Sequence, residues 1–88
     1  MDFVHLHLHT HYSRMDAISK PEDVINRVKE LGQKAVAFTE HGTTTSLIEG
    51  YKLAKKAGIK FIFGCEVYLC ANVNIRDKNY YHLILLAK

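Results

Sequence analysis

The first eleven residues alternate between apolar and polar side chains, and the spacing that follows is helical. Residues 3–11 read Phe-Val-His-Leu-His-Leu-His-Thr-His, with a histidine at every second position. Side chains of a β-strand point alternately to its two faces. We therefore predict a strand over residues 3–9 whose apolar face packs in the core. The opposite face carries the histidines: His5, His7, His9 and His11.

The next segment has the apolar spacing of an amphipathic helix over residues 19–31. Ser19 followed by Glu22 has the spacing of a capping box, and Pro21 suits the first turn. Gly32 is the expected end of this helix. The predicted buried stripe consists of Val24, Ile25, Val28 and Leu31.

The rest of the chain predicts two further strands around a second helix, then a last strand. A short apolar strand is expected over residues 35–39, and a strand over 61–69 follows the second helix. That helix is expected over residues 45–57, with a possible Ser46/Glu49 capping box and Gly58 at its end. A polar loop over 72–79 precedes an apolar run over 81–87, which we predict to be a strand buried on both faces. The predicted apolar face of the second helix is Leu47, Ile48, Tyr51 and Ala54.

Strands that alternate with helices indicate right-handed crossovers and a mostly parallel sheet, which is an α/β fold. Ligands of such folds bind at the carboxyl ends of the strands. His7 and His9, then His41, then Glu66 stand at three successive strand ends, whereas His82 lies near the start of its strand. Imidazole and carboxylate groups are common metal ligands. The pattern therefore predicts a site for divalent metal ions (zinc, manganese or magnesium).

Composition sets limits without identifying a function. The chain has 88 residues, enough for at most one small domain, and a formal net charge of +3. No apolar run is long enough to cross a bilayer, so we expect a cytoplasmic protein with no membrane partner. Cys65 and Cys70 would point to opposite faces of a strand, which disfavours a mutual disulfide. Because the predicted elements end on a strand with no helix to cover it, we expect residues 1–88 to be the first, truncated part of a larger barrel.

Several motifs follow one another in a fixed order along the chain. They are His7-Leu8-His9-Thr10, Tyr12-Ser13, Met15-Asp16, Thr39-Glu40-His41-Gly42, Gly58-Ile59-Lys60, Gly64-Cys65-Glu66-Val67-Tyr68 and the final eight residues from Tyr81. This ordered set resembles the PHP (polymerase and histidinol phosphatase) domain family. The version at the amino terminus of bacterial replicative DNA polymerase III alpha subunits is similar over nearly the whole chain.

The resemblance implies the amino-terminal portion of a distorted (β/α)7 barrel with a trinuclear metal centre. It also implies catalytic roles for Glu66, which bridges two metals, and for His41. Glu40 stands where the family usually has aspartate, and the extra methylene would move its carboxylate by about 1.5 Å, one covalent bond, relative to His41. The implied metal ligands are His7, His9, Asp16, His41, Glu66 and His82.

The resemblance further implies a part of a DNA-directed DNA polymerase, with DNA and replisome subunits as partners. Its PHP domain would hydrolyse phosphoesters as a 3′–5′ exonuclease or pyrophosphatase. The alternatives are a free-standing phosphatase similar to histidinol phosphatase, or a non-catalytic module braced by metals. We expect residues 1–88 alone to be inactive, and the sequence leaves the oligomeric state open.

Three polar residues near the predicted site have a less specific interpretation. His5 is expected to be held by contacts with metal-binding residues or with the core, and His11 to be an exposed loop residue or a neighbour of the substrate. Arg14 is interpreted as an exposed loop arginine, with a phosphate contact as the alternative.

Overall fold

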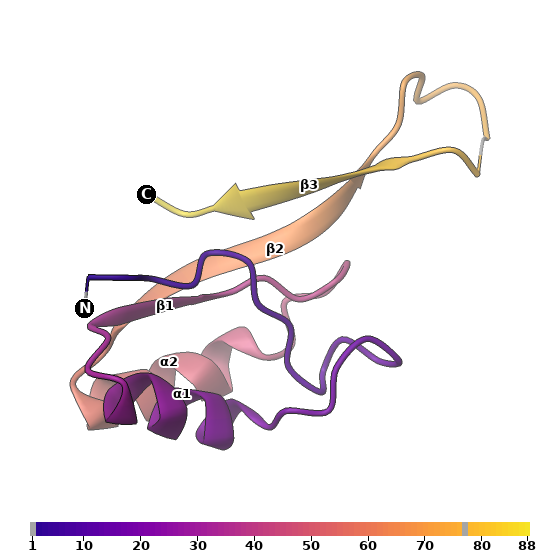
Figure 1. Ribbon diagram of the computed structural model, residues 1–88. Helices are drawn as coiled ribbons and strands as arrows, with labels where there is room; N and C mark the ends of the chain where they lie inside the picture. The colour runs from indigo at the N-terminus through magenta and orange to yellow at the C-terminus, as the bar shows by residue number, and fades with distance from the viewer. Residues whose placement is uncertain (1, 77) are drawn as a thin grey trace.

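The computed structural model describes residues 2–76 and 78–88 as a three-stranded sheet with both helices on one side (Figure 1). No helix in this described part is long and apolar enough to span a bilayer. The elements are α1 (Pro21–Glu30), β1 (Ala35–Phe38), α2 (Leu47–Ala57), β2 (Lys60–Leu69) and β3 (Tyr81–Leu86), with strand order β1-β2-β3.

The predicted parallel sheet is confirmed for β1 and β2 but not for β3. The parallel register runs from Ala35 opposite Lys60 to Phe38 opposite Phe63. β3 pairs with β2 in the antiparallel direction. Parallel neighbours need a long crossover, usually a helix, whereas antiparallel neighbours can be joined by a loop. The described residues between β2 and β3 form no helix, so the chain turns back as an extended hairpin.

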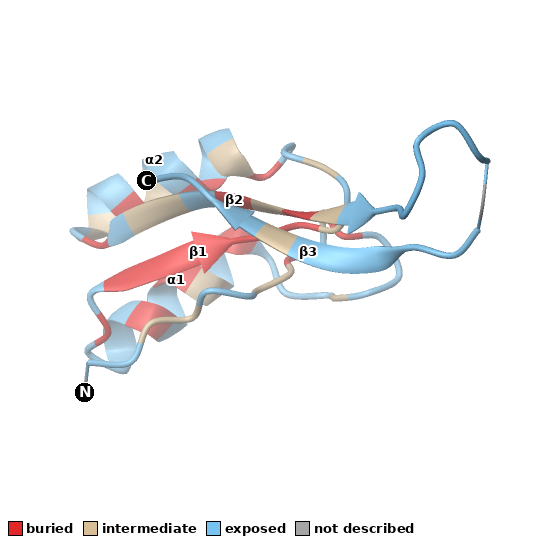
Figure 2. Cartoon of the chain, turned by 90° about the horizontal axis from the view of Figure 1, so that it is seen from above, coloured by how far each residue is buried: buried red, intermediate tan, exposed pale blue. Residues whose placement is uncertain are grey.

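The prediction that the last strand is buried on both faces is wrong for this chain. All residues of β3 are exposed or intermediate in burial, and the strand is mainly pale blue in Figure 2. The helices pack on the sheet beneath β1 and β2, so no described element covers β3. By contrast, all four residues of β1 are buried.

The amino-terminal segment lies beside β1, but the strand predicted over residues 3–9 does not form. Its backbone makes one isolated parallel bridge, between His5 and Val36. The Ala37 N–H donates to the His5 carbonyl (2.9 Å), and the Thr39 N–H donates to the Leu8 carbonyl (2.9 Å). Three residues of the segment therefore advance against two residues of β1, which is the geometry of a bulge.

This bulge divides the predicted row of histidines. His5 shares a cavity with Leu8 beside α1, whereas His7 and His9 approach β2 from the other side. The predicted common face of the histidines is therefore wrong at His5. His5 is half-buried and lines this cavity with Leu8, Val24 and Val28, because the extra residue reverses the side-chain alternation.

The helix ends agree with the predicted glycines but not with the predicted capping boxes. Gly32 and Gly58 follow the two helices with positive φ values of 70° and 74°. α1 begins at Pro21, whose fixed φ and missing N–H suit a first helical position, so Ser19 lies too early to cap it. Ser46 does precede α2, but its backbone is helical and its side chain makes no capping hydrogen bond.

The core lies between the helices and the strands β1 and β2. Its fully buried members include Ile25 and Val28 from α1 and Phe38 from β1. The buried face of α2 is rotated from the predicted one: Ile48 is 70% exposed, while Gly50 and Ala54 are buried. A side chain at Gly50 would place its Cβ 2.7 Å from the rings of Phe38 and Phe61. The missing side chain therefore lets α2 approach the sheet closely.

We expect Gly50→Ala to destabilise the fold by about 1–3 kcal/mol, the usual effect of overpacking a core. A glycine-to-alanine change at an open helical site would stabilise by about 1 kcal/mol, so the sign of the effect is diagnostic. Urea unfolding of the wild-type chain and the variant measures the difference. Lys56→Ala, at an exposed position of α2, is the control and should change the unfolding free energy by less than about 0.5 kcal/mol. Equal or greater stability of Gly50→Ala would contradict the close approach.

Candidate metal centre

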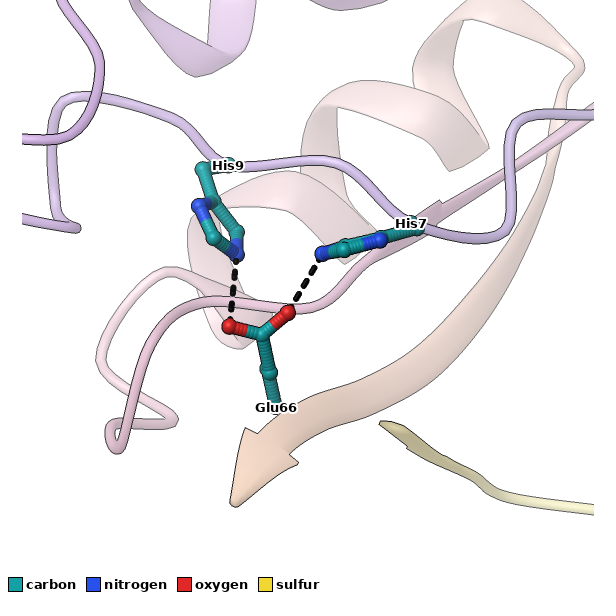
Figure 3. A group of neighbouring side chains, drawn as sticks. All are labelled: His7, His9 and Glu66. Atoms are coloured by element: carbon teal, nitrogen blue, oxygen red, sulfur yellow. Dashed lines mark ion pairs between the residues drawn. The ribbon is translucent and has the colours of Figure 1, made fainter. Parts of the chain in front are cut away.

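The Glu66 carboxylate lies at the centre of a cluster of imidazoles. Its side chain belongs to β2 and is only 2% exposed. His7 and His9 reach it from the amino-terminal segment, one ring toward each carboxylate oxygen (Figure 3). The His7 Nε2 lies 2.5 Å from Oε1, and the His9 Nε2 lies 3.6 Å from Oε2. The arrangement places two imidazoles and one carboxylate around a common point.

Two further imidazoles meet the same carboxylate, His41 from the end of β1 and His82 from β3, the two strands that flank β2. The His41 Nε2 lies 3.2 Å from Glu66 Oε2, and the His82 Nδ1 lies 3.6 Å from the same oxygen. His41 follows β1 and forms a parallel bridge with Glu66, which extends the β1–β2 register. Glu66 is therefore shared by two groups of potential metal ligands.

The antiparallel direction of β3 explains why His82 reaches the cluster although it lies near the start of its strand. His82 pairs with Tyr68, near the end of β2. An antiparallel strand begins beside the point where its neighbour ends. A residue near the start of β3 therefore reaches the same edge as the residues near the carboxyl ends of the other strands.

Asp16 lies at the edge of this cluster and contacts His41. Its Oδ2 is 2.8 Å from the His41 Nδ1, which leaves the Nε2 of that ring directed toward Glu66. A carboxylate on the second ring nitrogen fixes the orientation of a metal-binding histidine. Asp16 is outside both groups of three potential ligands found among the described residues.

The cluster fits divalent metal ions. The Nε2 atoms of His9 and His41 are buried and have no hydrogen-bond partner in the described part of the chain. Two atoms that each bind a tetrahedral ion at about 2.1 Å are separated by about 3.4 Å. The distances from Glu66 Oε2 to His9, His41 and His82 are 3.6, 3.2 and 3.6 Å. Metal binding would satisfy the two buried nitrogens with little movement.

A second buried carboxylate, Glu40, fixes the loop that follows His9. Its Oε1 accepts hydrogen bonds from the Thr10 N–H (2.8 Å) and the Ser13 hydroxyl (2.7 Å), and its Oε2 accepts one from the Thr10 hydroxyl. Burial acts to raise the pKa of Glu40, but the hydrogen bonds from the Thr10 and Ser13 hydroxyls and the Thr10 amide hold that pKa below its ordinary value. Glu40 is therefore stabilised as a charged, fully buried group.

The described contacts assign Glu40 an indirect role toward His41. Its carboxylate makes no hydrogen bond with that ring, whose Nδ1 is held by Asp16 instead. The backbone N–H of His41 donates to the Ser13 hydroxyl (2.9 Å), which itself donates to the Glu40 carboxylate. Glu40, which is one methylene longer than the aspartate expected at this position, therefore acts on the backbone of His41 through Ser13 and not on its ring.

The structure brings together most of the residues that the sequence placed in the site. His7, His9, His41, Glu66 and His82 meet directly, and Asp16 joins through His41. His11 is exposed and belongs to neither group of potential ligands. Sequence reasoning missed Thr10 and Ser13, which are buried at 0% and 2% exposure. Their signal was weak, because small hydroxyl residues are frequent in exposed loops.

The chain resembles known proteins both in sequence and in structure. The pattern of the PHP domain family matches residues 5–88. The DNA polymerase III subunit alpha of Treponema pallidum is 39% identical over 94 residues, which covers 100% of this chain and 8% of that protein. The Helicobacter pylori 26695 subunit is 45% identical over 89 residues, which covers 98% of this chain and 7% of that protein. A PolC-type DNA polymerase III of Thermotoga petrophila is 46% identical over 79 residues, which covers 88% of this chain and 6% of that protein.

The chain thus spans less than a tenth of the length of these relatives. Among solved structures, an amidohydrolase of Chromobacterium violaceum with bound SO4 and no metal aligns with a TM-score of 0.77 and 29% identity, covering 94% of this chain and 27% of that one. A candidate metal-dependent phosphoesterase of Bifidobacterium adolescentis aligns with a TM-score of 0.72 at 21% identity, covering 92% and 26%. At this identity, the second alignment supports the fold alone.

We expect Glu40→Gln to lower the unfolding free energy by about 1–3 kcal/mol at neutral pH, because hydrogen bonds to a buried charge are replaced by weaker ones. A carboxylate with a lowered folded-state pKa adds stability above its unfolded pKa and loses it as pH falls through the folded value. The difference between wild type and variant should therefore shrink below about pH 4.5, the ordinary value for glutamate.

Urea unfolding in EDTA across this pH range measures the effect without bound metal. Glu30→Gln is the matched control, because Glu30 is 66% exposed and pairs only with Arg27 among the described residues. This variant should differ from wild type by less than about 1 kcal/mol at any pH. A Glu40→Gln effect that is independent of pH would contradict a charged buried carboxylate.

Proposed function

The chain belongs to the PHP domain family, and from this premise we propose that it is the amino-terminal part of the PHP domain of a bacterial replicative DNA polymerase III alpha subunit. Alpha subunits that are 39% and 45% identical over at least 98% of the chain support this assignment. On this proposal the parent protein is a DNA-directed DNA polymerase of the cytoplasm. Its partners would be DNA and the other replisome subunits.

We further propose that the imidazole cluster is a multinuclear site for divalent metals. The observation that carries this proposal is that one buried carboxylate, Glu66, is shared by two pairs of imidazoles. The many nitrogen ligands favour zinc, and the carboxylates also tolerate manganese or magnesium. The proposed ligands are His7, His9, Asp16, His41, Glu66 and His82.

The proposed reaction is phosphoester hydrolysis, as a 3′–5′ exonuclease or a pyrophosphatase. Clustered divalent ions supply an activated water molecule and neutralise phosphate charge. His7 and His82 are 55% and 51% exposed, so a phosphate can approach the cluster from the solvent. Asp16 orients His41, and Glu66 holds the two imidazole pairs at one point.

The test uses the protein as its gene encodes it, with single-stranded DNA or pyrophosphate as substrate and no nucleoside triphosphates present. We expect hydrolysis of one of the two substrates that requires added zinc or manganese and is stopped by EDTA. Glu66→Gln should lower kcat by at least about 100-fold, because it removes the shared charge at the reacting centre.

Glu30→Gln is the matched control, because it makes the same change at an exposed glutamate of α1 that belongs to neither group of potential ligands. It should retain turnover within about twofold. Metal binding without turnover of either substrate would instead favour the braced structural module, and turnover limited to small phosphomonoesters would favour a histidinol-phosphatase-like enzyme.

A further inference from the structure

A cavity of about 440 Å³, lined by residues with polar groups, lies between the two loops that leave the metal centre. One loop begins after His9 and the other after His41, and the cavity starts two residues further along each chain segment. Two residues span at most about 7 Å. The cavity therefore adjoins the candidate metal centre. Its lining residues are His11, Tyr12, Arg14, Thr43 and Thr45.

The lining carries positive charge and hydroxyl groups. Arg14 is exposed and forms no ion pair with the residues that the structure describes, unlike Arg27, which pairs with Glu30. The Thr43 hydroxyl donates to the Thr45 hydroxyl (3.1 Å). A guanidinium group binds phosphate oxygens through two parallel N–H donors, and hydroxyls add further donors. This chemistry favours a phosphate over a neutral ligand.

The backbone holds Arg14 apart from its neighbour Asp16. Met15, between them, has a positive φ of 67°, which is unusual for a residue with a side chain. The preceding Ser13 is fixed by Glu40. The turn directs Asp16 to His41, while Arg14 lines the cavity.

One acidic group lies beside the cavity and is already engaged. The Tyr12 hydroxyl donates to the Glu49 carboxylate at 2.5 Å. This hydrogen bond is the main cause of a raised Tyr12 pKa, with smaller contributions from desolvation and the charge of Glu49. Tyr12 therefore stays protonated and shields part of the Glu49 charge from a bound anion.

We propose that this cavity is a subsite for the phosphate that neighbours the scissile phosphate in single-stranded nucleic acid. Arg14 binds the neighbouring phosphate, and the hydroxyls of Thr43 and Thr45 complete the subsite. The inference rests on the proposed phosphoesterase function, because the scissile phosphate must occupy the metal centre. It identifies the substrate as a strand with at least two phosphates in sequence.

Chemical-shift mapping on the zinc-loaded 88-residue chain tests the subsite. The probes are thymidine 5′-monophosphate, with one phosphate, and the 5′-phosphorylated thymidine dinucleotide, with two. We expect both probes to shift the signals of His7 and His9. Only the dinucleotide should also shift Thr43 and Thr45.

Arg14→Gln should weaken dinucleotide binding about fivefold, a typical cost for one exposed phosphate contact, and leave monophosphate binding unchanged. Arg14→Lys should restore part of the lost dinucleotide affinity, because lysine keeps the positive charge but lacks the two parallel N–H donors of the guanidinium. Arg27→Gln, which removes the same charge from α1, should change neither affinity.

The outcomes separate the subsite from the proposed function. Equal dinucleotide affinity in wild type and Arg14→Gln, or no added shift at Thr43 and Thr45, would overturn the subsite. If the monophosphate leaves His7 and His9 unshifted, the phosphoesterase proposal fails. The dinucleotide signals at Thr43 and Thr45, and their dependence on Arg14, report phosphate binding in the cavity separately from the signals of His7 and His9 at the metal centre.

Discussion

The burial of the Glu66 carboxylate is the constraint on which the rest of the site depends. A charged group with 2% exposure is costly unless partners of opposite charge or strong hydrogen bonds surround it. Its neighbours are imidazoles from the amino-terminal segment, from the end of β1 and from β3. Each of these segments must therefore keep its register with β2. The parallel and antiparallel ladders and the bulge beside β1 together bring the four rings to one place.

The loops around the site are held by a different set of contacts. Glu40 accepts hydrogen bonds from Thr10 and Ser13, and Ser13 accepts one from the backbone of His41. These buried contacts join the loop after His9 to the end of β1. The same framework fixes the loop that carries Arg14 and Asp16. The positions of the charged side chains of Arg14 and Asp16 near the metal centre thus depend on Glu40, Thr10 and Ser13, which are not proposed to bind metal.

The sequence predicted the α/β class, both helices and the strands β1 and β2 because their apolar spacing and terminal glycines are local signals. It also predicted that His41 and Glu66 would meet, since the ends of parallel strands share one edge of a sheet. The direction of β3 depends on its pairing with β2 and cannot be predicted from the spacing of apolar residues within β3. The bulge that separates His5 from His7 is a property of two segments, which alternation along one of them cannot predict. For Asp16 and His82, the family resemblance indicated a place in the site that spacing alone did not.

A crystal structure of the zinc-loaded chain, with anomalous diffraction at the zinc edge, tests the central role of Glu66 most directly. The account predicts anomalous peaks on both sides of the Glu66 carboxylate, one beside His7 and His9 and one beside His41 and His82. Each ion should lie about 2.0–2.2 Å from a Glu66 oxygen. Zinc bound elsewhere, or held by these histidines without Glu66, would contradict the account.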